Sequence, residues 1–221
     1  SRTKATQSKP IKIYNTLIEA GQNVVIKIPV GRIPSGNIIS IRAHVYRGPR
    51  LGPCMVPLGG VHGDEVNGVE IVRRSVEQGI FTHLHAGTVI AIPLLNVYGF
   101  INFSRDVPDG KDVNRRFPGN ATGSLASRVA RIFTREILPV IDFGIDFHTG
   151  GRGHYNYPQV RFTSDHLPSA ELAKAFGAPF TIEAKPVKSS LRRTAVDLNK
   201  AIIVYEGGEN LRFDEFSIQQ G

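Results

Sequence analysis

Short apolar runs alternate with amphipathic segments along most of this chain, and this alternation limits the possible fold more than any other feature. Apolar runs of strand length occupy residues 53–58, 88–93, 141–147 and 201–205. Apolar residues at helical spacing occupy residues 66–79, 124–138, 169–176 and 191–198. Buried strands joined by helices of this length predict a three-layer α/β/α fold with a mixed, largely parallel sheet.

The first fifty residues follow a different pattern. Residues 1–10 are polar and basic and predict a loose arm. Two strand-like runs, 23–30 and 37–45, flank a turn-rich segment and predict a β-hairpin or a pair of edge strands. We therefore expect an N-terminal arm and hairpin, residues 1–50, packed on one α/β domain, residues 51–221, since 221 residues are few for two cores.

The overall composition is that of a basic globular protein. The 27 Lys and Arg residues exceed the 19 Asp and Glu residues, giving a net charge of +8. These basic residues are dispersed and no nucleic-acid-binding motif accompanies them, so an anionic small substrate is favoured over nucleic acid. The apolar runs are too short to span a membrane. The single cysteine, Cys54, excludes an internal disulfide and predicts a cytoplasmic protein in which it fills the core.

Three of the apolar runs lead directly to side chains that bind metals or move protons. The first is followed by a glycine-rich turn with His62 and Glu65, the third by His148, and the last by Glu206. A helix that begins near residue 62 would place His62 and Glu65 on one face of its first turn. Ligand sites in such sheets lie beyond the carboxyl ends of the strands, so all four side chains are expected at one edge.

Two histidines and one carboxylate form the ligand set of catalytic zinc sites, which keep the fourth position open for water. We therefore predict one Zn²⁺ bound by His62, Glu65 and His148. Glu206, between an apolar strand and two glycines, is the candidate general acid/base. Glu209 is a less favoured alternative because it lies beyond the turn.

A long polar stretch, residues 96–123, lies between the second strand and the second helix, and loops of this length are often functional. It carries Arg105, which could polarise a carbonyl group or bind an oxyanion. It also carries Asn114 and Arg115, which could bind a substrate carboxylate, since a guanidinium binds a carboxylate in bidentate fashion. Arg192 is a weaker candidate for a second anion contact.

Four short motifs make the chain resemble the succinylglutamate desuccinylase/aspartoacylase family from about residue 25 to its end. They are Gly60-Val-His62-Gly-Asp-Glu65, Asp112-Val-Asn114-Arg115, Asp146-Phe-His148-Thr-Gly and Tyr205-Glu206-Gly-Gly208. The resemblance implies a zinc carboxypeptidase-like fold and a zinc hydrolase catalytic domain over residues 51–221. It assigns the zinc ligands, the acid/base and the substrate contacts to the same residues as above. Compared with the family's pattern, the spacing from Arg105 to Asp112 is longer, and these 221 residues are expected to lack the family's C-terminal β domain.

These observations predict a zinc-dependent hydrolase that cleaves the amide bond, other than a peptide bond, of an N-acyl amino acid or similar small carboxylate-bearing substrate. A zinc carboxypeptidase acting on peptide C-termini is the nearest alternative. A basic nucleic-acid-binding module without catalysis, and a metal-binding member of the family without activity, are further alternatives. The acyl group, the amine and the oligomeric state are not predicted.

Overall fold

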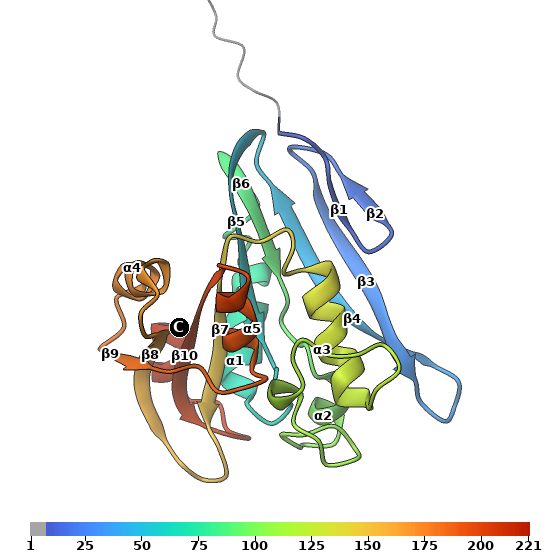
Figure 1. Cartoon of the computed structure of the whole chain (residues 1–221), viewed down its shortest axis with the longest axis vertical. Coiled ribbons are helices and arrows are strands. Elements are labelled where there is room, and N and C mark those ends of the chain that lie inside the picture. The colour runs from blue at the N-terminus through green and yellow to red at the C-terminus, as the bar shows by residue number, and fades with distance from the viewer. Residues whose placement is uncertain (1–7) are drawn as a thin grey trace, which may run out of the picture.

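An eight-stranded mixed sheet forms the centre of the molecule in the computed structural model, which describes residues 8–221 (Figure 1). Its strand order is β3-β4-β6-β5-β7-β10-β8-β9, and a separate two-stranded sheet pairs β1 with β2. The strands are β1 (Ile11–Ile13), β2 (Thr16–Ile18), β3 (Asn23–Arg32), β4 (Ile38–Arg47), β5 (Arg50–Gly59), β6 (Ala86–Ala91), β7 (Phe143–Gly150), β8 (Asn156–Thr163), β9 (Phe180–Ala184) and β10 (Ala201–Glu209).

Residues 8–221 also form six α-helices and one short 3₁₀ helix, of which all but the last α-helix lie between strands. They are α1 (Val66–Glu77), α2 (Val97–Ile101), η1 (Val113–Arg115), α3 (Leu125–Glu136), α4 (Leu167–Phe176), α5 (Leu191–Asp197) and α6 (Glu215–Gln220). Within this part of the chain, none of them combines the length and the apolar character that a membrane crossing requires.

The middle of the sheet is parallel and its margins are largely antiparallel. Parallel pairings join β6, β5, β7 and β10 in turn. The hairpin of β3 and β4 continues the same sheet through antiparallel pairing of β4 with β6. On the other side β8 runs antiparallel to β10 and parallel to β9. The predicted α/β fold with an N-terminal hairpin is therefore confirmed, and β5, β7 and β10 end at the same edge.

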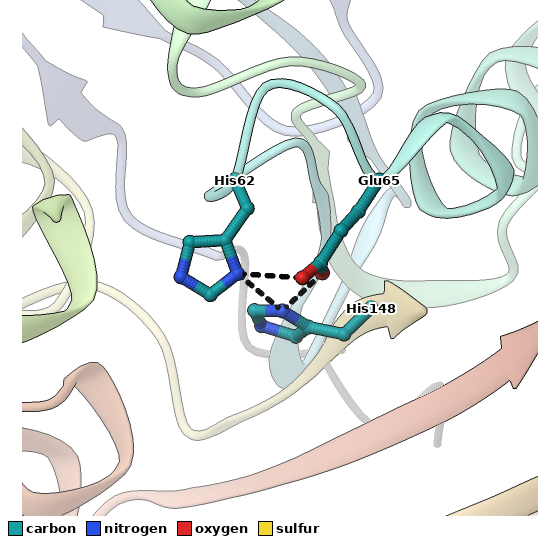
Figure 2. Close-up of side chains that lie close together, drawn as sticks. All are labelled: His62, Glu65 and His148. Carbon is teal, nitrogen blue, oxygen red and sulfur yellow. Dashed lines mark hydrogen bonds and ion pairs between the residues drawn. The ribbon is translucent and has the colours of Figure 1, made fainter. Parts of the chain in front are cut away.

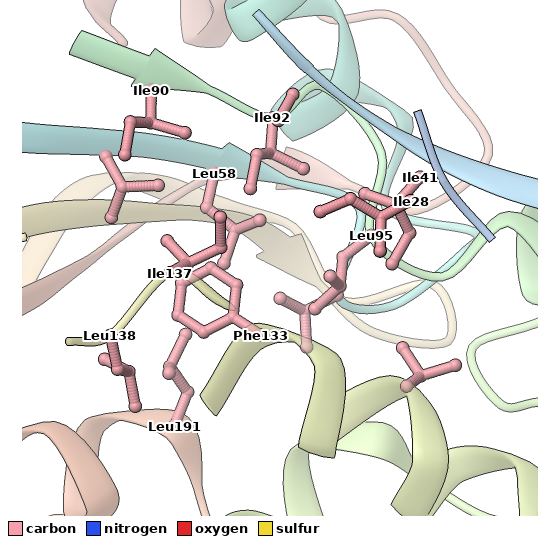
Figure 3. Close-up of a cluster of buried hydrophobic side chains, with 14 of the residues drawn as sticks. Ile28, Ile41, Leu58, Ile90, Ile92, Leu95, Phe133, Ile137, Leu138 and Leu191 are labelled. Atoms are coloured by element: carbon pink, nitrogen blue, oxygen red, sulfur yellow. The ribbon is translucent and has the colours of Figure 1, made fainter. Parts of the chain in front are cut away.

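Helices cover both faces of the sheet and give the predicted three layers. On one face, α3 and α5 bury Phe133 and Leu191 against strand residues such as Leu58 and Ile90 (Figure 3). On the other face, α1, α4 and α6 pack with Phe147 and neighbouring residues in a second apolar cluster. Burial of apolar side chains on both faces fixes the sheet, and with it the strand ends that carry the polar residues.

Several short elements are absent from the sequence-based prediction. The hairpin of β1 and β2 immediately follows residues 8–10 of the predicted arm, and residues 1–7 of that arm lie outside the described residues. The polar stretch 96–123, predicted as a loop, contains α2 and η1. Strand β9 is exposed along most of its length. These elements are too short or too exposed to produce apolar periodicity, so the pattern could not reveal them.

Candidate active site

The turn between β5 and α1 carries the first two candidate ligands. Gly60 adopts φ +64°, a left-handed conformation, where the chain leaves the sheet. His62 and Glu65 lie in the following turn, in which the Glu65 amide donates to the His62 carbonyl oxygen at 3.3 Å. Helix α1 starts only at Val66, so the expectation that both side chains project from its first turn is wrong. The turn, rather than a helical face, brings the two together.

This turn is pressed against α2 of the long loop. A Cβ atom on Gly63 would collide with the backbone of Gly99 and Phe100. The Gly63 amide also donates to the carbonyl oxygen of Arg105 at 3.4 Å. Glycine is therefore required at residue 63 because the two backbones touch.

Three side chains converge at the carboxyl edge of β5 and β7 (Figure 2). Nδ1 of His62 lies 2.9 Å from Oε1 of Glu65, and Nδ1 of His148 lies 2.7 Å from Oε2 of Glu65. The two Nδ1 atoms face each other at 3.2 Å. His148 lies within β7, near the carboxyl end of the strand, and does not follow it. All three residues are buried, with 2–4% of their surface exposed.

The separations between these donor atoms suit a single small cation. Zn–N and Zn–O bonds of about 2.0–2.2 Å at tetrahedral angles place neighbouring donors about 3.3–3.5 Å apart. The observed separations, 2.7–3.2 Å, are slightly shorter. One carboxylate and two imidazole nitrogens are also the donor types that zinc prefers. The cluster therefore has the chemistry and the size of a metal site.

The outer nitrogen of each imidazole lies beside a second carboxylate. Nε2 of His62 is 3.1 Å from Oδ1 of Asp112. Nε2 of His148 is 2.8 Å from Oδ2 of Asp146, a close contact that does not meet the criteria for a hydrogen bond. A carboxylate on the outer side keeps the proton on Nε2 and directs the lone pair of Nδ1 inward, as around metal-binding histidines.

The charges of neighbouring groups in the cluster outweigh the effect of burial on the pKa values. Burial acts to lower the pKa of His62, but the carboxylates of Glu65 and Asp112 outweigh it and raise that pKa. The pKa of His148 is raised in the same way, against burial, by Asp146 and Glu65. Burial opposes ionisation of Glu65, but the two histidines hold its pKa well below the usual range. The site thus presents an ionised carboxylate to any bound cation.

Glu206 stands next to this cluster on the neighbouring strand. It pairs with His148 in the register of β10 and β7, and its side chain is 14% exposed. Burial raises the pKa of the Glu206 carboxyl, while His148 and Arg161 partly oppose that effect. Asn156 donates a hydrogen bond to the carboxylate. A partly desolvated carboxylate of this kind suits proton transfer.

The candidate substrate contacts come from the long loop and from α5. Arg105 donates from Nη2 to Oδ2 of Asp112 at 3.1 Å and from Nη1 to Oε1 of Glu65 at 3.3 Å. Asn114 accepts the backbone N–H of Leu191 through Oδ1 at 2.9 Å, which ties η1 to the start of α5. Arg115 is exposed and donates only to a backbone carbonyl oxygen.

A cavity of about 430 Å³ brings all of these residues together. Its lining includes the eight residues selected from the sequence, namely His62, Glu65, Arg105, Asn114, Arg115, His148, Arg192 and Glu206. A cavity of this volume suits a small molecule, and the residues that line it are mainly polar or charged.

The family relationship follows from comparison with known proteins. Residues 52–221 match the family described as the succinylglutamate desuccinylase/aspartoacylase catalytic domain. The chain belongs to this family. The matched residues include the parallel centre of the sheet, the candidate ligands His62 and His148, and Glu206.

Individual relatives agree with this family membership. The chain is 31% identical over 194 residues to an N-alpha-acetyl-L-2,4-diaminobutyric acid deacetylase from Halomonas elongata, covering 80% of this chain and 54% of that protein. A succinylglutamate desuccinylase/aspartoacylase structure from Rhodobacter sphaeroides has a TM-score of 0.77 and 28% identity, covering 90% of this chain and 61% of that one. The product-bound structure of the ectoine utilization protein EutE (DoeB) from Ruegeria pomeroyi has a TM-score of 0.82 and 25% identity. It covers 97% of this chain and 68% of that one. The chain thus spans about half to two thirds of the length of these relatives.

A more distant structure supports the predicted carboxypeptidase-like architecture. A metallo-carboxypeptidase from Burkholderia cenocepacia has a TM-score of 0.63 at 14% identity, which relates the two folds only.

Four residues that the structure places at the candidate active site had received no role from the sequence. Asp112 and Asp146 lie within the quoted motifs, and the Asp-Phe-His spacing puts Asp146 on the same strand face as His148, so both could have been found. Asn156 and Arg161 lie on β8, which pairs with β10, and only the strand register places them beside Glu206.

Proposed function

We propose that this protein is a zinc-dependent hydrolase that cleaves the amide bond of an N-acyl amino acid or a similar small carboxylate-bearing substrate. The observation that carries the proposal is the convergence of His62, Glu65 and His148, with a carboxylate behind each imidazole. Family membership and the deacetylase named among the relatives support the reaction type. A cytoplasmic location remains a prediction from the sequence.

The ligand set fits zinc on this chain's own geometry. His62 and His148 would bind the ion through Nδ1 and Glu65 through its carboxylate. When bound, zinc polarises carbonyl groups and lowers the pKa of water toward about 7. The remaining chemistry belongs to the protein's side chains.

Glu206 is the group that would move protons. It accepts the proton of the attacking water through its carboxylate and then donates that proton to the departing nitrogen. Its burial next to the cluster keeps the proton affinity of the carboxylate above that of an exposed glutamate. Both steps use one residue because the acid formed in the first is the donor needed in the second.

The arginines would bind and orient the substrate. Arg105, held by Asp112 and Glu65, is placed to donate to the oxygen that gains negative charge during attack. Arg115 and Asn114 lie at the cavity lining and would bind the carboxylate of the amino acid. A fixed carboxylate keeps the amide near the metal site and raises its effective concentration.

Metal analysis combined with a substrate panel tests the proposal. The purified protein is expected to contain about one zinc per chain, as the one ligand cluster among residues 8–221 requires, and to hydrolyse acetyl, succinyl or aspartyl amides of amino acids. Short peptides serve as the comparison, since a carboxypeptidase would cleave them at the C-terminus. Absence of bound metal, together with affinity for nucleic acid that falls steeply with salt, would instead favour the nucleic-acid-binding alternative.

A further inference from the structure

The positive charge of the chain is concentrated in its first 63 residues, although the basic residues there are dispersed along the sequence. These residues hold nine Lys and Arg side chains and one acidic side chain, Glu19, so they account for the whole net charge of +8. Between Glu19 and Asp64 the sequence has no carboxylate side chain, and residues 64–221 hold equal numbers of basic and acidic residues. Such an asymmetry within one chain indicates an anionic partner for the basic part.

Part of this charge lies on the hairpin of β3 and β4, at one margin of the sheet (Figure 1). Burial alternates along both strands, because their inward side chains belong to the apolar core. The outward side chains form a second face, on which Val25 is 54% exposed and Lys27 and Arg42 are also exposed. We call this surface the hairpin face, and its paired residues are Val25 with His44, Lys27 with Arg42, and Pro29 with Ser40.

Two cations of the hairpin face stand directly opposite each other. The antiparallel register pairs Lys27 with Arg42, which corresponds to about 4.5–5.5 Å between their Cβ atoms. Neither side chain forms an ion pair with a carboxylate within residues 8–221. Burial, together with the positive charge of Arg42, lowers the pKa of His44 on the same face. Opposed like charges destabilise a sheet, and an anion bound across them relieves that repulsion.

A cavity of about 240 Å³ opens beside these cations. Its lining combines polar side chains of β4 with apolar side chains near the start of α2, namely Ser40, Arg42, His44, Pro93, Leu94 and Val97. The cavity is smaller than the roughly 300–1,000 Å³ of most small-molecule sites. An aliphatic side chain that projects from a partner suits it, with the basic residues of β4 at its rim.

We propose that the hairpin face binds an acidic segment of another protein, whose carboxylates contact Lys27 and Arg42 and whose aliphatic side chain enters the cavity beside His44. This inference goes beyond the proposed hydrolase function and does not depend on it. A second copy of the chain is a poor occupant, because its own hairpin face repeats the same cations. Nucleic acid is also disfavoured, since Tyr46, the next residue on this face, already packs against Phe81 with 5.8 Å between ring centroids.

The partner is expected to lie across the hairpin face rather than to extend the sheet. Strand β3 is an edge strand, but Pro29 and the register shift between Pro29 and Gly31 interrupt it. Both features oppose the addition of another strand. A segment that follows the ten-residue strands spans about 33 Å. Side-chain charge and shape, rather than backbone pairing, would therefore determine the affinity.

A synthetic acidic peptide tests this surface in the full 221-residue chain. The probe is a fluorescein-labelled peptide of about twelve residues, long enough to follow one strand, with Glu at every position except two central Leu residues. Fluorescence anisotropy at about 50 mM salt should show binding that weakens about 10-fold or more at about 200 mM salt. Replacement of both Leu residues by Ala should weaken binding about 3- to 10-fold, because the contact in the cavity is lost.

Lys27→Glu is the decisive variant. It places a carboxylate opposite Arg42, so the variant should fold and unfold at the same temperature as the unaltered chain or a higher one. Its affinity for the peptide should nevertheless fall about 10-fold or more. Lys174→Glu, at an exposed residue of α4, changes the net charge by the same amount and should lower the affinity less than about 3-fold.

Three outcomes would overturn the inference. Equal losses in Lys27→Glu and Lys174→Glu would show that the peptide responds to net charge alone. Absence of binding at about 50 mM salt would exclude the contact. Single-stranded DNA and vesicles of phosphatidylserine and phosphatidylcholine provide the comparison, and a Lys27→Glu effect seen with either of them but not with the peptide would assign the face to another class of partner. Amide hydrolysis is not measured, so failure of the proposed function leaves these results unaffected.

Discussion

The proposed metal ligands and the arginine wall, which consists of Arg115, Arg161 and Arg192, line one cavity but are held in different ways. His62, Glu65 and His148 are buried, and each contacts another member of the cluster through strand ends and a tight turn. Arg115, Arg161 and Arg192 are exposed or half-buried and are held mainly by backbone carbonyl oxygens or polar side chains. Burial thus holds the proposed metal ligands in place, while the more exposed arginine side chains line the space for a substrate.

The largest expected effect is at the cluster. His148→Ala should abolish zinc binding and reduce turnover by about 1000-fold or more, because two ligands cannot hold the ion in an active geometry. Zinc content by mass spectrometry and the rate of amide hydrolysis measure both effects. His166→Ala is a matched control, since His166 lies on the turn before α4, away from the cavity. Retained zinc and turnover in His148→Ala would remove this residue from the site.

Glu206→Gln separates proton transfer from metal binding. The amide keeps the hydrogen-bonding shape but cannot accept the proton, so kcat should fall about 10²- to 10⁴-fold with zinc retained. Steady-state kinetics with parallel metal analysis checks this. Glu209→Gln tests the alternative base in the same way, and a greater loss there than in Glu206→Gln would transfer the role to Glu209.

Asp146→Asn tests how strongly the Asp146 carboxylate, which lies beside Nε2 of His148, supports metal binding by the cluster. Loss of the negative charge beside Nε2 of His148 should weaken zinc affinity about 10- to 100-fold. Competition with a chelator of known affinity provides the measurement. Turnover at saturating zinc should fall less than in Glu206→Gln, and unchanged zinc affinity would contradict the proposed orientation of the imidazole.

The smallest effect should come from the arginine wall. Arg115→Gln should raise KM about 10-fold with little change in kcat, because it removes one exposed charged contact to the substrate carboxylate. Initial-rate kinetics on an N-acyl amino acid resolves the two constants. Arg116→Gln, the adjacent exposed arginine that does not line the cavity, is the control. A fall in kcat with KM constant would place Arg115 in the chemical step.

Sequence patterns predicted the strand ends that carry this site, but not the contacts that β8 makes with it. The apolar runs before His62, His148 and Glu206 correspond to β5, β7 and β10, whose parallel register brings their ends together. Arg161 could not be selected in this way, since only the antiparallel pairing of β8 with β10 relates it to Glu206. Apolar periodicity reports what each segment buries, whereas contacts between distant strands depend on register.

The contact between Gly63 and Gly99 has a consequence for how the site assembles. The turn that bears His62 packs directly against the segment with α2, so each segment supports the shape of the other. If zinc binds as proposed, its ligation and the ordering of residues 96–112 are expected to be thermodynamically linked, so that the ion would stabilise a loop that it does not touch. Arg105 and Asp112 belong to that segment, and their side-chain contacts with Glu65 and His62 are expected to couple their alignment to metal occupancy together with the backbone contact.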